Sequence, residues 1–283
     1  MLCDSVRRCA AVRGRTALAA LLLAVLIALL VGVLTGGRVV DLDLAVYRWS
    51  PAQHWPQLSG VLAWWVVLGQ RAVCLSLAAL WLGWRARRER DRRPLVVLLV
   101  ATALTEVGVG GMKMLVGRLG PLQLGADAVL PGAAQVFAAG GTIFPSGHTA
   151  NAVVTWGVVA MLARERRRLG VVLAAAVAVS VGLTTVYLGT HWLSDVLAGW
   201  CAGGLVLLAV PVAVPWTVRA GGAVRRRAVA LVPDPLAWMA ARPPTLVRPG
   251  VTPGRGTNVE SAAARPRERT APTHVRDPRR PAP

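Results

Sequence analysis

Residues 144–151 read Phe-Pro-Ser-Gly-His-Thr-Ala-Asn, a short polar stretch between a glycine- and alanine-rich loop and a long apolar run. Pro145 ends the preceding segment, and residues 146–149 supply helix-capping hydroxyls just before the apolar run 150–163 takes up helical character. The start of a helix directs free N–H groups and the positive end of its dipole to one point, which suits an anion. Gly147 lets an anion approach the backbone closely, and His148 adds a titratable donor. The simpler interpretation is a helix cap beside a polar histidine.

The composition around this stretch is that of a membrane protein. The chain has 283 residues, of which 55% are hydrophobic and only 16% charged, and its mean hydropathy is +0.53. The formal net charge of +19 comes from short basic clusters between apolar runs and from a basic tail. In a membrane protein this pattern sets orientation, so we expect the lipid bilayer, and no nucleic acid, as a partner.

The apolar runs predict an all-α fold, a six-span transmembrane helical bundle with a disordered basic C-terminal tail. We expect a basic cytoplasmic arm over residues 1–15, a six-helix membrane domain over 16–216, and an Arg/Pro-rich, largely disordered tail over 217–283. The first run is longer than the core of a signal peptide, so we interpret it as an uncleaved span rather than a cleaved one. The six predicted spans are residues 16–35, 59–84, 94–112, 149–163, 170–188 and 193–216.

Arginine clusters between the spans predict the orientation in the cell membrane. The hairpins at 85–93 and 164–168 are strongly basic, which is typical of cytoplasmic loops. Both termini then lie in the cytoplasm. The stretch at 144–151, Lys113 and the turn at 189–195 all fall on the extracytoplasmic face.

Two ionisable residues fall at membrane depth, Arg71 in the second span and Glu106 in the third. Such residues normally face a partner or a water-filled cavity. We therefore hypothesise that they form an ion pair; the alternative is that each snorkels separately to the interface.

Further candidate site residues lie at the ends of the third and fifth spans. Lys113 is the only lysine of the chain, and it suits either a phosphate-binding charge or an interfacial anchor. His191 and Asp195 are four residues apart, so on a helix they share one face. The carboxylate can then hold one ring nitrogen and leave the other free, as in a nucleophilic histidine. A helix cap is again the simpler interpretation of this pair.

Three segments, 113–121, 144–148 and 184–195, resemble the signature motifs of the type 2 phosphatidic acid phosphatase superfamily. That superfamily includes membrane lipid phosphatases, bacterial acid phosphatases and vanadium haloperoxidases. The six-span layout, over roughly residues 16 to 216, is also similar to its membrane branch.

The resemblance implies a role for each motif residue. His191 would be the nucleophile that accepts the phosphoryl group, Asp195 would orient it, and His148 would protonate the leaving oxygen. The phosphate oxygens would be held by Lys113, Ser146 and the backbone N–H groups of Ser146 and Gly147. No metal or cofactor is implied.

The sequence departs from the family pattern at two phosphate-binding arginines. Gly120 stands where the first motif has arginine, and Thr185 stands where the third has it. Each lost charge-assisted contact is worth roughly 1.5 to 3 kcal/mol, so losing both slows transfer by about a hundred- to ten-thousandfold unless other groups compensate. Arg118 is a candidate replacement for one of them, although relatives often carry a basic residue there as well.

The function predicted is hydrolysis of a lipid phosphate or diphosphate, either an isoprenoid diphosphate or a phosphatidic-acid-like lipid, on the extracytoplasmic face. The partner is therefore a phosphorylated membrane lipid, and the sequence leaves the oligomeric state open. The alternative is a weakened relative that binds phosphorylated lipid without turnover, because Gly120 and Thr185 replace the arginines. A haloperoxidase is a more distant third reading, since it would need the same arginines to hold vanadate.

Overall fold

The structure is a computed structural model that describes residues 2–163 and 167–231, with side chains described over 12–163 and 167–218. Helices account for nearly all regular structure in these ranges, and the only β-type pairing there is an isolated bridge between Arg118 and Phe137. The predicted all-α class is therefore confirmed. Most of the predicted tail, residues 232–283, lies outside the described part of the chain.

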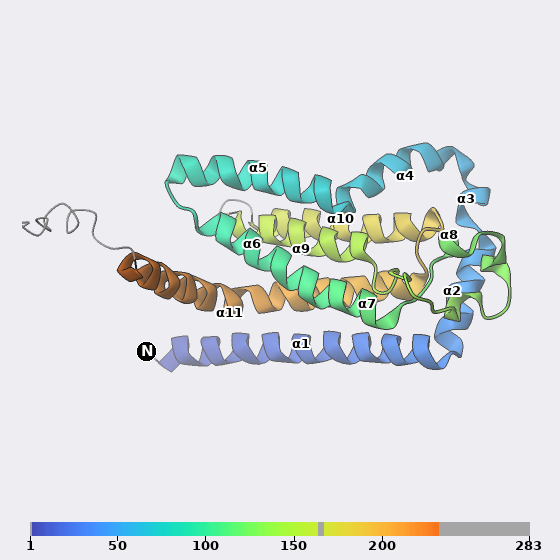
Figure 1. Ribbon diagram of the computed structural model, residues 1–283, viewed down its shortest axis with the longest axis horizontal. Helices are drawn as coiled ribbons and strands as arrows, with labels where there is room; N and C mark the ends of the chain where they lie inside the picture. The colour runs from blue at the N-terminus through green and yellow to red at the C-terminus, as the bar shows by residue number, and fades with distance from the viewer. Residues whose placement is uncertain (1, 164–166, 232–283) are drawn as a thin grey trace, which may run out of the picture. The chain divides into compact units, whose positions relative to one another are not determined.

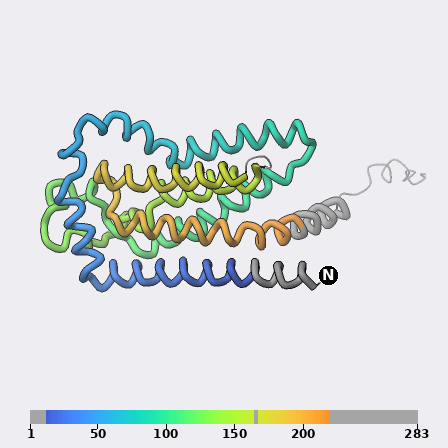
Figure 2. Tube along the Cα trace, turned by 180° about the vertical axis from the view of Figure 1, so that it is seen from behind, coloured from blue at the N-terminus to red at the C-terminus, as the bar shows by residue number. Residues whose placement is uncertain are grey.

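The N-terminal helix α1 (Leu2–Thr35) packs along the last helix, α11 (Leu193–Leu231) (Figure 1). It is followed by Gly36 and Gly37, both with positive φ, which permits a sharp turn into α2 (Arg38–Trp49). Seen from behind, α2 rises across the end of the bundle (Figure 2). This placement brings a polar residue of α2 to the site described below.

The second predicted span is broken in the middle. A single turn, α3 (Pro51–His54), and the short helix η1 (Pro56–Leu58) lead into α4 (Ser59–Trp65) and η2 (Val66–Gly69), and the long helix α5 (Arg71–Glu89) then leaves at an angle of 58°. At the break, a Cβ on Gly69 would lie 2.5 Å from a Val181 methyl and 2.8 Å from the carbonyl oxygen of His148. The absence of a side chain therefore lets the break lie against the predicted site.

The third span consists of α6 (Arg93–Thr105), a π-helical turn η3 (Glu106–Gly110) and α7 (Gly111–Val116). A loop follows that contains three short helices, α8 (Pro121–Leu124), η4 (Gly125–Val129) and η5 (Ala133–Gln135). The remaining spans are α9 (Gly147–Leu162), α10 (Arg167–Tyr187) and α11, and α9 contacts α5, α6, α10 and α11. The helix that carries the 144–151 stretch is thus central to the bundle (Figure 1).

Four helical segments of the described chain are long and apolar enough to cross a membrane: Val12–Thr35, Arg93–Val116, Arg167–Tyr187 and Leu193–Val218. The bent pair Pro56–Gly69 and Arg71–Glu89 gives a fifth if it is one span. Helix α9 has 16 residues, shorter than the roughly 17 to 25 typical of a spanning helix. The protein is therefore a multi-pass membrane protein, and the count of six spans stays a prediction.

Helix α11 extends beyond its predicted end at residue 216. It runs through Pro211 and Pro215 and ends at Leu231. The first part of the segment predicted to be disordered is therefore helical in backbone.

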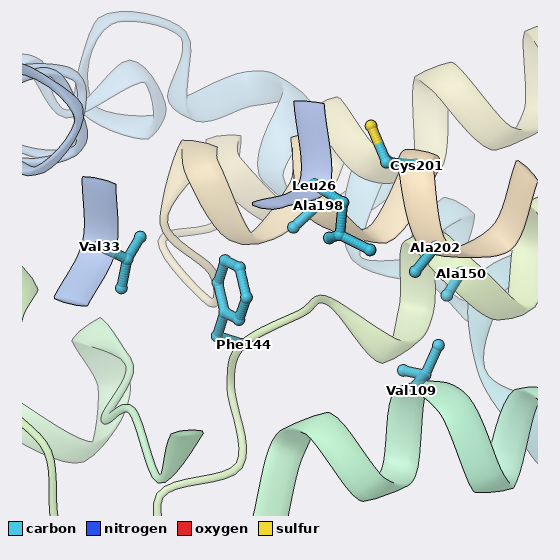
Figure 3. Packing of buried hydrophobic residues seen from close by; sticks show 8 residues of the cluster. All are labelled: Leu26, Val33, Val109, Phe144, Ala150, Ala198, Cys201 and Ala202. Atoms are coloured by element: carbon cyan, nitrogen blue, oxygen red, sulfur yellow. The ribbon is translucent and has the colours of Figure 1, made fainter. Parts of the chain in front are cut away.

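Small residues bring α11 and the start of α9 into close contact. Cβ atoms at Gly199 and Gly203 would lie 2.8 Å from the Ser146 carbonyl oxygen and from the Val153 Cβ. Glycines four residues apart let two membrane helices approach closely. Next to this contact, Phe144 is fully buried in a cluster with residues of α1 and α11 (Figure 3). The segment that leads into α9 is therefore fixed in place on both sides.

Candidate active site

Helix α9 begins at Gly147, within the predicted capping stretch 146–149 and two residues before the predicted span. Ser146 is its N-cap, and the Ser146 hydroxyl oxygen accepts hydrogen bonds from the N–H and the hydroxyl of Thr149 at 3.4 and 2.9 Å. The Ser146 N–H donates to the backbone carbonyl oxygen of Asp195 at 2.8 Å. The start of α9 is therefore joined directly to the first turn of α11.

An open cleft of about 380 Å³ lies over this helix start. Of the predicted site residues, Lys113, Gly147, His148 and His191 line the cleft. Ser146, Asp195 and Arg118 do not. The lining residues are Gly69, Gln70, Arg71, Lys113, Ile143, Gly147, His148, Asn151 and His191.

The two histidines of the motifs face each other across the cleft. Their ring centroids are 6.0 Å apart and the ring planes are inclined by 71°. His191 is 6% exposed, whereas His148 is only half-buried. A small tetrahedral group placed between them can therefore reach both rings.

Lys113 extends over the start of α9. Its ammonium donates a hydrogen bond to the carbonyl oxygen of Thr142, and a Cβ on Gly147 would lie 3.6 Å from Nζ. The lysine is therefore next to the N–H groups of the first turn of α9. Of its two predicted roles, this position suits the phosphate-binding charge.

Ser146 does not line the cleft. Its side chain is fully buried, and its hydroxyl is engaged by Thr149. In this geometry its contribution to anion binding is to fix the start of α9.

Asp195 faces His191 but does not bond to it directly. Its Oδ2 lies 3.7 Å from the Nδ1 of His191, which is too long for a hydrogen bond. The same Oδ2 accepts the Trp192 N–H at 3.0 Å. Nδ1 of His191 is buried and has no hydrogen-bond partner among the described residues. The Asp195 carboxylate is the acidic group that faces this nitrogen and could accept a hydrogen bond from its proton after a small shift.

Arg118 lies behind the site rather than in it. Its side chain is fully buried, and its guanidinium donates to Asp195 at 2.6 Å, to Asp43 at 2.7 Å and to the Ser194 hydroxyl at 2.8 Å. It also donates to the carbonyl oxygen of Ala134. All of its polar atoms are thus engaged by protein, so the arrangement argues against the predicted phosphate contact of Arg118.

Asp43 of α2 completes this buried network and was not among the predicted site residues. Its carboxylate also accepts the N–H of Ser194 at 2.7 Å and the Ser194 hydroxyl at 2.5 Å. Burial raises the pKa of the Asp43 carboxyl, while the Arg118 guanidinium opposes that shift. One guanidinium held by two carboxylates leaves the network at most one negative charge in excess, next to His191.

Neither position of a missing family arginine has room for a long side chain. Even a Cβ at Gly120 would lie 2.6 Å from Cγ1 of Ile143. Thr185 is fully buried, and its hydroxyl donates to the Gly182 carbonyl oxygen at 2.7 Å. Both positions are therefore closely packed in this chain.

Arg71 is the arginine that lines the cleft. It is the first residue of α5, and its guanidinium lies 2.9 Å from the carboxylate of Glu106 in the π-helical turn. The hypothesised ion pair is therefore confirmed. Nothing in the sequence indicated that Arg71 of this pair would line the same cleft as the two histidines.

No cluster of three or more His, Cys, Asp or Glu side chains suited to a metal ion occurs among the described residues. The cleft instead combines imidazoles, cationic side chains and backbone N–H groups. Such a set can hold a tetrahedral anion and move a proton at its edge.

The fold and this site together define a helical membrane protein with two histidines at one cleft. Residues 94–219 match the family model of the PAP2 superfamily. This segment contains all three motifs, so the predicted resemblance to the superfamily is confirmed.

Two similar proteins come from Bacillus subtilis. The curated phosphatidylglycerophosphatase B of strain 168 is 35% identical over 74 residues, which are 24% of this chain and 36% of that protein. The matched segment thus spans about a third of the curated relative. A crystal structure described as the first transmembrane PAP2 type phosphatidylglycerolphosphate phosphatase matches with a TM-score of 0.56 and 24% identity, over 70% of this chain and 94% of that one. At this identity the structural match shows a shared fold.

Proposed function

We propose that this protein is a metal-independent lipid phosphatase that works through a phosphohistidine intermediate. The observation that carries the proposal is the placement of His148, His191 and Lys113 around one cleft at the start of α9. The PAP2 superfamily match over residues 94–219 supports the same reaction class.

In the first step, Nε2 of His191 attacks phosphorus and the bond to the leaving oxygen breaks. His148 donates a proton to that oxygen, so the lipid leaves as a neutral alcohol, or as a lipid monophosphate if the substrate is a diphosphate. The second step reverses these roles: His148 takes a proton from water, the water oxygen bonds to phosphorus, and the N–P bond breaks. Inorganic phosphate and free His191 are released.

Charge around the cleft favours these steps. Phosphoryl transfer spreads negative charge over the equatorial oxygens, so fixed cations and N–H donors stabilise the transition state. Lys113 and the N–H groups at the start of α9 supply them. The imidazole gains positive charge on Nε2 phosphorylation, and the excess negative charge on Asp195 and Asp43 offsets it.

The substrate belongs to the phosphorylated membrane lipids. The two candidates are an isoprenoid diphosphate and a phosphatidic-acid-like lipid. In either case the phosphorylated headgroup would enter the small open cleft while the lipid tail stays in the bilayer. The name of the curated relative adds phosphatidylglycerophosphate, a phosphate monoester of the same class.

Orientation follows from the basic hairpins, with both termini in the cytoplasm and the cleft on the extracytoplasmic face of the cell membrane. A C-terminal fusion to green fluorescent protein is then expected to fluoresce. A fusion to alkaline phosphatase at the same point should be inactive, and the reverse pattern would contradict the orientation.

The test of the reaction is phosphate release by detergent-purified protein, without added metal, from each of the three lipids. We expect release from at least one lipid, and its loss by more than a thousandfold in His191→Ala, because the nucleophile is removed. His54→Ala is the matched control, since His54 is exposed in α3, away from the cleft.

The second candidate is binding of phosphorylated lipid without turnover. The observation that favours it is the loss of room for arginine at Gly120 and Thr185. Binding of phosphatidic acid vesicles with no release above the His191→Ala control would select it.

A further inference from the structure

The cleft has a second cationic side that no motif contains. At the break in the second span, Gln70 has an extended backbone and Arg71 opens the 19-residue helix α5. Both residues line the cleft together with Lys113 and Gly147. The first turn of α5 therefore directs its N–H groups and the positive end of its dipole toward the same space as α9 does.

The Arg71 side chain is available to a ligand. It is 55% exposed, and that of its partner Glu106 is 41% exposed. The pair is therefore not enclosed by protein as the ion pairs of Arg118 are, and the guanidinium can change its partner more readily. A phosphate group can then replace the Glu106 carboxylate.

The other arginine candidates cannot serve this cleft. Arg118 is fully buried and bonded to two carboxylates. Positions 120 and 185 hold a glycine packed on Ile143 and a buried threonine. Among the residues lining the cleft, Arg71 supplies the guanidinium.

We propose that Arg71 is a phosphate-binding residue, which supplies from the break in the second span the guanidinium that the motifs of this chain lack. Glu106 holds it in place while the cleft is empty. On binding, the guanidinium turns its N–H donors from Glu106 to the phosphate oxygens. The inference rests on the proposed function, since it assigns a ligand contact to the same cleft.

The test uses orthovanadate, a phosphate analogue, and measures its dissociation constant by calorimetry on the purified full-length protein. Arg71→Gln is expected to weaken binding by roughly ten- to a hundredfold, the range for one charge-assisted contact. Arg71→Lys keeps the positive charge but loses the planar guanidinium with its paired N–H donors. Its affinity for vanadate should therefore lie between those of the wild type and Arg71→Gln. Arg87→Gln is the matched control: it removes an arginine from the same helix, at a residue outside the cleft.

Glu106→Gln separates a ligand contact from a folding effect. The amide removes the competing charge and can still accept a hydrogen bond from Arg71. We expect vanadate to bind at least as tightly as to the wild type. A loss as large as that of Arg71→Gln would show that both variants disturb the fold, and would overturn the inference.

Two further outcomes overturn it: equal affinity of Arg71→Gln and wild type, or no vanadate binding to the wild type. Failure of the proposed function looks different. If no lipid releases phosphate but vanadate affinity still depends on Arg71, the inference stands and the reaction falls. If lipid is hydrolysed but the affinity for vanadate does not change in Arg71→Gln, the proposed reaction is supported and the inference about Arg71 is wrong.

Discussion

Arg118 and Arg71 both pair with carboxylates, but Arg118 is fully buried between Asp43 and Asp195, whereas Arg71 and Glu106 are about half exposed. A buried guanidinium without partners is strongly destabilising, so Arg118 cannot exchange its carboxylates for a ligand. A half-exposed guanidinium is not enclosed by protein in this way and can change its partner more easily. Burial therefore decides which of these two arginines a ligand in the cleft could reach.

Arg118→Met should have the largest effect among the variants that test this difference between the two arginines. It leaves two buried carboxylates without their cation, so we expect a loss of about 3 to 5 kcal/mol in the free energy of unfolding. Denaturant unfolding in detergent measures the loss. Arg87→Met serves as control, because Arg87 is exposed on α5. A loss below about 1 kcal/mol would mean that the buried network contributes little.

Asp43→Asn weakens the same network from the other side. The amide cannot accept all the hydrogen bonds from Arg118 and Ser194, so the loss should be about 1.5 to 3 kcal/mol. Phosphate release should fall as well, since Asp195 and His191 lose a fixed neighbour. Asp41→Asn is the control on the same helix, at an exposed site, and equal effects of the two changes would contradict the assignment.

Gly120→Arg restores a family arginine where the structure has no room. The side chain meets Ile143, so overpacking should cost about 1 to 3 kcal/mol without raising phosphate release. The double change with Thr185→Arg should be worse, because Thr185 is fully buried. Faster release by either variant would show that these positions can still reach the phosphate.

Glu106→Gln should give the smallest effect on stability, about 0.2 to 1 kcal/mol, and the effect should shrink as salt screens the exposed pair. Unfolding at low and high sodium chloride measures this. The loss in Arg118→Met, in contrast, should hardly depend on salt. A salt-independent loss above 2 kcal/mol in Glu106→Gln would place Arg71 in the same structural class as Arg118.

Local signals in the sequence predicted much of the site. The capping residues predicted the start of α9 to within a few residues, and the motifs named His148, His191 and Lys113, which line one cleft in the structure. The pairing of Arg71 with Glu106 followed from two charges at membrane depth. These predictions depend either on residues close in sequence or on the high free-energy cost of an unpaired charge at membrane depth.

What escaped prediction depends on packing between distant segments. Asp43 is 75 residues from Arg118 and 151 from Ser194, so nothing in its neighbourhood showed that it would be buried. The break at Gly69 contains no proline, and the close approach of Gly69 to His148 and Val181 involves residues distant in sequence. Ser146 was predicted to hold phosphate because a free hydroxyl and a buried cap look the same in sequence.

The buried bridge through Arg118 also bears on biosynthesis. It joins α2, the loop after the third span and the first turn of α11, so its last partner arrives only with the final span. During translation Asp43 and Arg118 are synthesised before Asp195, so the bridge is incomplete until the first turn of α11 has been made. The carboxylate that faces His191 thus acquires its fixed position at the end of insertion, and a chain interrupted before α11 would keep His191 but lack the carboxylate that faces it.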